Sequence, residues 1–331
     1  MSTTTRAVLS ILAVAACLSA PARAADAPLS AEQERGLKAK DSFRECAGCP
    51  EMVVVPAGSF TMGSPVDEKG RDQTDNRDES PQHRVTIARP FAVGKFEVTR
   101  DQFANFVKAT NYDAGSECWT FEQERSEPRP GRSFRNPGFE QNGSHPAACL
   151  NWQDAKAYVR WLSRTTGKRY RLLTEAEWEY AARGRTTAGP APRFHFGDDE
   201  QAMCRYGNVA DQTAEKTIAG SATWPFFPCD DGYAYTAPAG SFAANAFGLH
   251  DMHGNVWEWT EDCYHFGYRG TPTDGSAWLY GNCKDRVLRG GSWLYDPGFH
   301  RAALRFRFTA ALRYSSVGLR VARTLQPGAG R

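Results

Sequence analysis

The chain has 331 residues, of which 41% are hydrophobic, so it is long enough to bury a sizeable core in one domain or two. Its 40 basic and 38 acidic residues are interspersed and give a net charge of +2. This distribution excludes the basic patch of a nucleic-acid-binding protein, and it gives no sign of a segment that binds a membrane surface.

The N-terminus has the layout of a secretory signal peptide. Arg6 precedes an apolar stretch over residues 7–18, and an Ala-Arg-Ala site ends at Ala24. We therefore expect residues 1–24 to be a signal peptide and the mature protein to be periplasmic or secreted. The alternative is a lipoprotein site at Cys17, which would give a lipid-anchored protein. No other stretch approaches the roughly 20 apolar residues of a bilayer-spanning helix, so no transmembrane span is expected.

Cleavage leaves eight cysteines, and an even number in an exported chain predicts disulfides. Eight cysteines allow about 105 pairings, among which we favour neighbours in sequence order. The expected disulfides are Cys46–Cys49, Cys118–Cys149, Cys204–Cys229 and Cys263–Cys283. Zinc binding and a redox function are alternatives for Cys46 and Cys49. However, no second ligand pair lies at zinc spacing, and Pro50 follows where a redox helix would begin.

Residues 25–50 form a polar lead-in segment that we expect to contribute little to the core. The domain proper should span residues 51–324 and leave a tail at residues 325–331. No internal repeat or Pro- and Gly-rich linker divides it, so one compact unit is expected. Within it, residues 52–63 mix β-branched residues with Gly and Pro, which predicts a strand followed by a turn. A loop should cover residues 64–80.

Three capping boxes predict three helices, which begin at Thr99, Asn151 and Thr174. Gly184 should end the third helix. From residue 185 onward Gly, Pro, Asn, Asp and aromatic residues dominate, so we expect little regular secondary structure there. Buried backbone groups in such a segment must be satisfied by side chains, disulfides or bound cations.

The segment from Asp251 to Trp259 places two carboxylates, Asp251 and Glu258, on either side of Gly254 and Asn255. A loop of this kind can supply the six to eight oxygen ligands that calcium takes. The same residues also fit a structural turn with aromatic anchors.

The chain resembles the formylglycine-generating enzyme and sulfatase-modifying factor family over residues 52–323. The motifs that carry the resemblance are Val55-Pro-Ala-Gly-Ser-Phe-Thr-Met-Gly63, Phe96-Glu-Val-Thr99, Asn151-Trp152, Leu173-Thr-Glu-Ala-Glu-Trp-Glu-Tyr-Ala-Ala-Arg-Gly184, Gly254-Asn-Val-Trp-Glu-Trp259, Arg289-Gly-Gly-Ser-Trp293 and Gly318-Leu-Arg320. The resemblance implies an α+β fold with little regular secondary structure, distantly similar to a C-type lectin and braced by disulfides and calcium.

The resemblance also implies two structural calcium sites. The ligands carried over to the first site are the side chains of Asn208 and Asp231 and the carbonyls of Val209 and Tyr233. Those carried over to the second site are the carboxylates of Asp251 and Glu258 and the carbonyls of Gly254 and Val256. Calcium is therefore the expected cofactor, and the oxygen-only ligand set agrees with its chemistry.

The chain departs from the family at the catalytic cysteines. Members that oxidise a sulfatase cysteine carry Gly-Gly-Ser-x-x-Cys-x4-Cys, whose two thiolates bind copper(I). Tyr295 and His300 occupy the two cysteine positions here. Because a phenol and an imidazole cannot replace two thiolates around copper, we expect neither copper binding nor copper-dependent formylglycine formation.

The candidate catalytic residues are His300, Tyr295 and Ser292, because imidazole and phenol groups can transfer protons. The alternative is that Tyr295 packs and His300 makes a surface hydrogen bond. A ligand groove could be lined by Trp257, Trp293, Arg301 and Arg305, whose arginines suit an anionic ligand. Alternatively, the tryptophans are core anchors and the arginines pair with acids.

Three functional hypotheses remain. The first is an exported family member that acts on or binds a peptide or protein without copper, and that, if an enzyme, is an oxidoreductase similar to the periplasmic pyoverdine-maturation branch. A non-enzymatic, lectin-like module for a protein or an envelope glycan is the second. The third, formylglycine generation on an exported sulfatase, is disfavoured by Tyr295 and His300. Fold alone does not choose between them.

Overall fold

The computed structural model of the chain describes residues 27–71, 78–185, 190–221 and 224–329. The expected signal peptide over residues 1–24 and the alternative lipid anchor at Cys17 lie outside these ranges. Within the described ranges, no helix has both the length and the apolar character needed to cross a bilayer.

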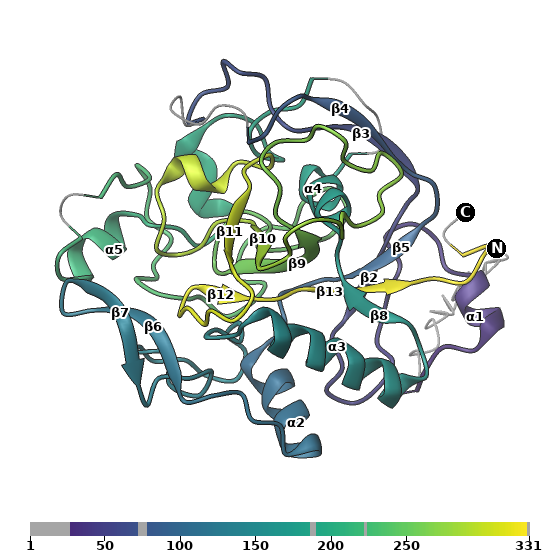
Figure 1. Cartoon of the computed structure of the whole chain (residues 1–331), viewed down its shortest axis with the longest axis horizontal. Helices are drawn as coiled ribbons and strands as arrows, with labels where there is room; N and C mark the ends of the chain where they lie inside the picture. Colours follow the sequence, from purple (N-terminus) through teal and green to yellow (C-terminus); the bar gives the residue numbers. More distant parts are fainter. Residues whose placement is uncertain (1–26, 72–77, 186–189, 222–223, 330–331) are drawn as a thin grey trace, which may run out of the picture.

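A five-stranded antiparallel sheet with the order β1-β2-β5-β13-β8 forms one centre of the fold (Figure 1). Its strands are β1 (Ser42–Phe43), β2 (Met52–Val55), β5 (Phe91–Gly94), β13 (Val321–Thr324) and β8 (Tyr170–Leu172). Every residue of β2 and β5 is buried, as their continuous apolar sequences require. The last strand of the chain therefore lies inside this sheet, between β5 and β8.

A second sheet, with the order β11-β10-β9-β12, positions the candidate site. Its strands are β11 (Phe306–Thr309), β10 (Asp285–Arg289), β9 (Trp257–Cys263) and β12 (Val317–Gly318), and β12 pairs with β9 in the parallel direction. Two further antiparallel pairs join β3 (Gly58–Met62) to β4 (His83–Ile87) and β6 (Glu117–Glu122) to β7 (Arg125–Pro130).

The three predicted helices are confirmed as α2 (Arg100–Thr110), α3 (Trp152–Thr166) and α4 (Glu175–Arg183). Thr99, Asn151 and Thr174 are their N-caps, and each forms a complete capping box. Gly184 ends α4 in the left-handed conformation, with φ of 63°. Every residue of α4 is buried, and the helix contacts β3 as well as β9 and β10 of the second sheet.

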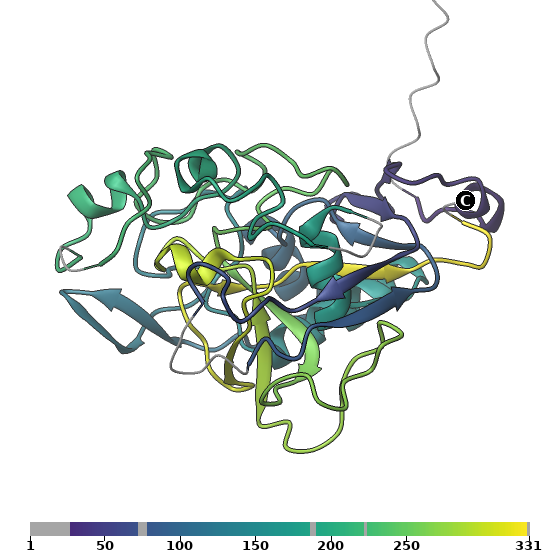
Figure 2. The ribbon, with the colours of Figure 1, turned by 90° about the horizontal axis from the view of Figure 1, so that it is seen from above.

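The lead-in segment is part of the core, which corrects the expectation that it contributes little. It contains the short helix α1 (Ala31–Arg35), and its Leu37 and Phe43 side chains are 1% and 4% exposed. The Glu34 carboxylate binds Arg323 of β13 at 2.8 and 3.0 Å. The start and the end of the described chain therefore lie side by side, as both views show (Figure 2).

The expectation of little regular structure holds for residues 190–256, whose described part contains only the short helices η1 (Glu200–Arg205) and α5 (Gln212–Thr217). It is wrong for residues 257–324, where the strands β9 to β13 and the short helix η2 (Pro297–His300) occur. Apolar residues separated by charged ones, as in Trp257–Cys263, gave too weak a local signal for strands that form by long-range pairing.

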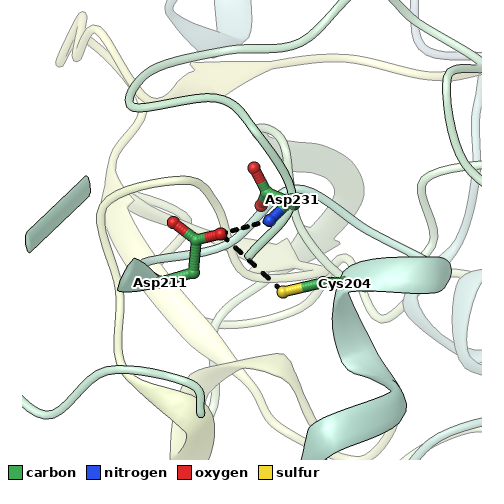
Figure 3. A group of neighbouring side chains, drawn as sticks. All are labelled: Cys204, Asp211 and Asp231. Atoms are coloured by element: carbon green, nitrogen blue, oxygen red, sulfur yellow. Dashed lines mark hydrogen bonds between the residues drawn. The ribbon is translucent and has the colours of Figure 1, made fainter. Parts of the chain in front are cut away.

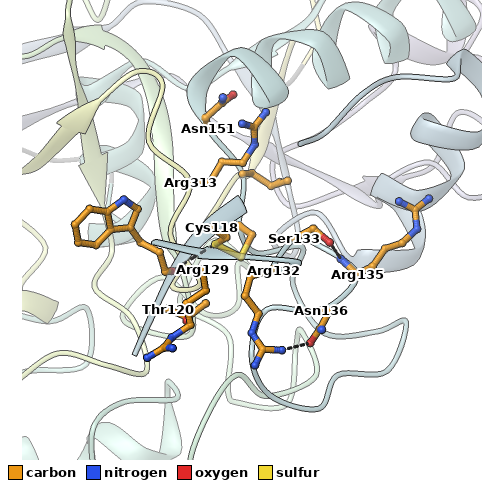
Figure 4. Close-up of a disulfide and its surroundings, with 12 residues drawn as sticks. Cys118, Thr120, Arg129, Arg132, Ser133, Arg135, Asn136, Asn151 and Arg313 are labelled. Atoms are coloured by element: carbon orange, nitrogen blue, oxygen red, sulfur yellow. Dashed lines mark hydrogen bonds between the residues drawn. A yellow bond between two sulfur atoms is a disulfide. The ribbon is translucent and has the colours of Figure 1, made fainter. Parts of the chain in front are cut away.

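All four disulfides join the predicted partners. Figure 4 shows Cys118–Cys149, which fastens the β6–β7 pair to the segment before α3. Nearby, Arg313 forms a two-pronged ion pair with Asp154 of α3, with both distances 2.9 Å. These contacts fix the chain on one side of the candidate site.

Candidate functional site

The segment that holds the three candidate catalytic residues follows β10 and begins with two glycines in the left-handed region. A Cβ atom on Gly291 would lie 2.6 Å from the His300 ring, so glycine is required for the ring to pack against the backbone. The carbonyl of Ser292 then brings the three residues together. It accepts the Tyr295 N–H at 3.1 Å and lies 3.1 Å from His300 Nε2.

His300 is completely buried, and both of its ring nitrogens face backbone carbonyls. Nδ1 lies 2.9 Å from the carbonyl of Asp296, and Nε2 faces Ser292. Burial lowers the pKa of His300 to about 4, so the ring is neutral at pH 7. The neutral ring carries one N–H and can donate to only one of these carbonyls, but both nitrogens are enclosed by the backbone, so proton transfer to a ligand would require this loop to open. A catalytic role for His300 stays a prediction.

Tyr295 is partly buried in a cluster of aromatic rings. Its ring centroid lies 5.4 Å from that of Trp257, at an interplanar angle of 82°, and 5.1 Å from that of Phe299. Burial raises the pKa of Tyr295, so the phenol keeps its proton at neutral pH. Tyr295 can therefore donate a hydrogen bond to a ligand or pack against one.

Several buried polar groups near the N-terminal end of β9 have no hydrogen-bond partner among the described residues. They are Ser292 Oγ, Trp293 Nε1, Ser315 Oγ and Ser316 Oγ. Backbone hydrogen bonds join their segments to the start of β9, because the Trp293 N–H donates to the carbonyl of Asn255 and the Trp257 N–H donates to that of Ser316. The sequence prediction missed Ser315 and Ser316, although they lie only three and two residues before the Gly318-Leu-Arg320 motif. Unsatisfied buried groups of this kind call for a ligand or water.

Two partly exposed aromatic rings flank Trp293. Phe139 and Tyr235 stack on each other with ring centroids 4.7 Å apart, and their centroids lie 5.2 and 5.1 Å from that of Trp293. The approach to the indole is therefore apolar and flat, which suits contact with a ligand. Sequence reasoning missed both residues, because they belong to segments far from residues 290–300 in the chain.

The expected ligand groove is corrected by the structure. Trp257 and Trp293 are 0% and 1% exposed, and Arg301 and Arg305 are 1% and 5% exposed. The two arginines hold carboxylates of the protein itself, as the alternative hypothesis stated. Arg301 binds Glu79 at 2.7 and 2.8 Å, and Arg305 binds Glu175 at 2.6 and 3.0 Å. Their charges are thus neutralised inside the core.

The first predicted calcium set lies in the irregular segment (Figure 3). The Asp231 carboxylate accepts hydrogen bonds from the Val209 and Tyr233 N–H groups, both at 2.8 Å. Asp211, which sequence reasoning missed, is the acidic neighbour of Asp231, and potential ligand atoms of these two residues and Cys204 lie within 4.8 Å of one another. Burial, with the Asp211 charge, raises the pKa of Asp231 to about 8. Cys204 cannot act as a thiolate because it is in a disulfide.

The second predicted set lies around Asp251, which is 2% exposed. Asp251 Oδ2 accepts the Gly240 N–H at 2.6 Å, whereas Oδ1 has no partner in the described chain. The Glu258 carboxylate is already engaged, since it binds Arg320 and accepts the Trp178 Nε1–H at 2.6 Å. Of the two acids, only Asp251 therefore has a free oxygen for a cation.

The two predicted sets touch through Gly254 and Asn208. A Cβ on Gly254 would lie 2.2 Å from the carbonyl oxygen of Asn208, which explains the glycine. Asn208 Oδ1 is another buried acceptor without a partner in the described residues. Glu97, a further acid that sequence reasoning missed, accepts the Val256 N–H at 3.1 Å, and burial raises its pKa. Its position in the Phe96-Glu-Val-Thr99 motif was the available signal.

Comparisons with known proteins agree with this architecture. A profile of the sulfatase-modifying factor enzyme 1-like domain matches residues 38–325. The formylglycine-generating enzyme of Mus musculus is 31% identical and aligns over 82% of this chain and 74% of its own length. Inactive C-alpha-formylglycine-generating enzyme 2 of Mus musculus is also 31% identical, over 80% of both chains. The structure of PvdO from Pseudomonas aeruginosa matches with a TM-score of 0.72 and 40% identity, over 87% of this chain and 99% of that one. The chain therefore belongs to the family of sulfatase-modifying factor enzyme 1-like domains.

Proposed function

We propose that this protein is an exported member of the family that binds or processes a peptide-containing ligand beside Ser292, without copper-dependent formylglycine formation. One observation carries the proposal: every cysteine in the described residues is in a disulfide, and Tyr295 and His300 stand where the copper thiolates are needed. A thiolate pair for copper(I) is thus missing from this part of the chain.

The groups around Ser292 support a peptide ligand. Ser292 Oγ and Trp293 Nε1 are buried donors without acceptors among the described residues, and a peptide carbonyl that reached them through a movement of this loop would be a suitable acceptor for either. Phe139 and Tyr235 offer a flat apolar wall beside them. Tyr295 supplies a neutral phenol. Together these residues can bind and orient a chain, and Tyr295 can hold a proton at its hydroxyl.

An oxidising location outside the cytoplasm is part of this proposal. Four disulfides are compatible with an extracellular or periplasmic protein, because cytosolic reductants keep most thiols reduced. Expression with and without residues 1–24, followed by fractionation of the cells, tests the location. Recovery of both forms in the cytoplasm would contradict it. Incorporation of a radiolabelled fatty acid that disappears in Cys17→Ser would instead favour the lipid anchor.

The test of the copper chemistry uses the purified protein, copper and a Cys-x-Pro-x-Arg peptide. We expect no aldehyde by mass spectrometry, whereas a copper-dependent relative assayed in parallel forms it. Aldehyde formation by this protein would overturn the proposal, since it would require a copper site without the cysteine pair.

A non-enzymatic, lectin-like module for a protein or an envelope glycan is the second candidate. It is favoured by the buried ring of His300, whose two nitrogens already face backbone carbonyls. Mass spectrometry of a captured ligand before and after incubation separates the two candidates. A changed ligand whose processing is lost in Tyr295→Phe or His300→Ala supports an enzyme. An unchanged ligand that stays bound supports the module.

We further propose that calcium is bound by the two acidic sets. Asn208 Oδ1 and Asp251 Oδ1 fit a cation, because both are buried acceptors without protein donors in the described chain. Calcium at 100 times its Kd would stabilise the fold by about 2.7 kcal/mol, so chelation should lower the Tm. Asp251→Ala should also lower the calcium content measured by elemental analysis, whereas exposed Asp274→Ala should not. An unchanged Tm with no calcium in the wild type would contradict this proposal.

A further inference from the structure

A cavity outside the Ser292 site lies beside the end of α4. It has a volume of about 380 Å³, and the residues that shape it include Arg185, Pro192, Phe194, His195, Phe196 and Ala246. Most of these surfaces are apolar or aromatic. No Asp or Glu occurs among the described residues that line it. Such a cavity, with flat apolar walls and few polar groups, is typical of a small-molecule site.

His195 is the polar group of this cavity that lacks a partner. Neither ring nitrogen makes a hydrogen bond within the described residues, although both nitrogens are buried. The ring is held firmly, because it stacks on His253 with centroids 5.2 Å apart and meets Tyr206 edge-on at 5.0 Å. A fixed ring with two unsatisfied nitrogens is rare in a protein interior and calls for a missing partner.

The surroundings leave His195 in its neutral form. Its own backbone N–H donates to His253 Nε2 at 3.2 Å, so His253 carries its proton on Nδ1 and donates to the carbonyl of His300 at 2.8 Å. His253 is thus satisfied and neutral. Burial also lowers the pKa of His195 to about 4. At neutral pH the His195 ring therefore offers one N–H donor and one acceptor.

Arg185 gives the cavity a positive charge that no carboxylate of the described residues neutralises. The other guanidinium in the wall, Arg183, pairs with Glu179 at 2.8 Å. Arg185 donates only to the carbonyl of Pro190, at 2.8 Å, and has no carboxylate partner among the described residues. A ligand that carries one negative charge would complete this arrangement.

We propose that this cavity binds a small aromatic carboxylate, whose ring packs against Phe194 and Phe196 and whose carboxylate accepts hydrogen bonds from Arg185 and His195. The aromatic walls select a flat apolar body, and the single unpaired guanidinium selects one anionic group. This site is distinct from the peptide site, although His253 joins the two by accepting the His195 backbone N–H and facing the carbonyl of His300.

Isothermal titration calorimetry of the purified full-length mature chain tests the proposal, with benzoate as the probe. Benzamide and benzylamine are the neutral and cationic analogues of the same shape. We expect benzoate to bind, with benzamide weaker by about tenfold, since it loses the charge-assisted hydrogen bond. Benzylamine should not bind. Failure of benzoate to bind at millimolar concentration, or equal binding of all three compounds, would overturn the proposal.

Two variants assign the binding to the cavity. Arg185→Gln should weaken benzoate binding by about tenfold, whereas Arg269→Gln, an exposed arginine elsewhere, should leave it unchanged. His195→Phe keeps the ring but removes its nitrogens, and it should weaken binding without lowering the Tm. Nitrogen-15 NMR of the wild type gives a second readout, in which benzoate should shift the His195 ring signals. If Arg185→Gln and Arg269→Gln bind benzoate with the same affinity, benzoate binds elsewhere and the proposal fails. This comparison decides the question even if His195→Phe does not fold.

Discussion

The helical region over residues 99–184 and the irregular segment over residues 190–256 satisfy the hydrogen bonds of their buried backbone groups in different ways. In the first, helix ladders and capping boxes satisfy backbone groups locally. In the second, a few buried side chains bond to several backbone groups each. Asn245, for example, accepts the Phe247 and Leu249 N–H groups and donates to the carbonyl of Ala181. The difference teaches that the stability of the irregular segment depends on few residues. Single substitutions of those residues should therefore lower the free energy of unfolding more than single substitutions in the helical region.

Asn255→Ala should show the largest effect. The amide binds Glu97 at 2.7 Å, accepts the Ala237 N–H at 3.0 Å and contacts Asn208 at 3.1 Å, all in the interior. Its removal takes one hydrogen bond each from the buried Glu97 carboxylate, the Asn208 amide and the Ala237 N–H, so we expect a loss of about 3–5 kcal/mol in the free energy of unfolding.

Urea unfolding of this variant is compared with that of Asn136→Ala, which alters an exposed asparagine and should cost less than about 0.5 kcal/mol. Similar losses in the two variants would show that the irregular segment does not depend on Asn255.

Removal of the Cys204–Cys229 disulfide should have the next largest effect. The bridge spans 25 residues of the irregular segment, so loop-closure entropy predicts a loss of about 3.5 kcal/mol in the double serine variant. The bridge from Cys46 to Cys49 spans only 3 residues, and its removal should cost about 2 kcal/mol. Thermal unfolding of both variants measures the difference. The reverse order would mean that the irregular segment is held without its disulfide.

Asp262 of β9 joins the helical region to a later part of the chain, and this junction can be tested through pH. Its carboxylate accepts the Glu175 N–H at the start of α4 and the Trp278 N–H of a distant loop, both at 2.7 Å. Burial, with the Glu175 charge, raises the pKa of Asp262 to about 8. The folded state therefore keeps a proton that the unfolded state releases above its ordinary pKa. Stability should fall as pH rises from about 4 to 8, by up to about 1.4 kcal/mol per pH unit.

Denaturant titrations at several pH values measure this slope. Asp262→Asn should flatten it, because the amide does not titrate. The control is Asp274→Asn, which alters an exposed acid and should leave the slope as it is. A wild-type slope that survives in Asp262→Asn must come from another group.

Thr174→Ala should show the smallest effect. Thr174 caps α4 by accepting the Glu177 N–H at 3.1 Å, and other contacts of the helix remain after its loss. A cap substitution of this kind costs about 1 kcal/mol. Thr174→Ser should recover most of the stability in the same urea titration. If Thr174→Ala lowered the free energy of unfolding as much as Asn255→Ala, the helical region would depend on single side chains as strongly as the irregular segment does.

The features predicted correctly from sequence are those with local causes. The three N-caps and Gly184 follow from residue types at fixed spacing, and the order of disulfides follows from short separations. The family motifs also placed Ser292, Tyr295 and His300 in one segment, and the structure brings them around one carbonyl.

The features that escaped prediction depend on distant partners. Whether Arg301 and Arg305 face a ligand or an internal acid depends on Glu79 and Glu175, which lie far away in the chain. The same applies to Phe139 beside Trp293 and to Asp211 beside Asp231. The lead-in segment looked polar because its acids were counted as solvent-exposed, whereas Glu34 is paired inside with Arg323.

The position of β13 has a consequence for when the protein can become native. This strand contains almost the last described residues, yet it is hydrogen-bonded to β5 on one side and to β8 on the other. Until it arrives, both neighbours have open edges and Glu34 lacks its arginine. A chain that is still emerging from the ribosome therefore cannot close its main sheet. Closure of the five-stranded sheet therefore has to wait until almost all of the described residues have been synthesised.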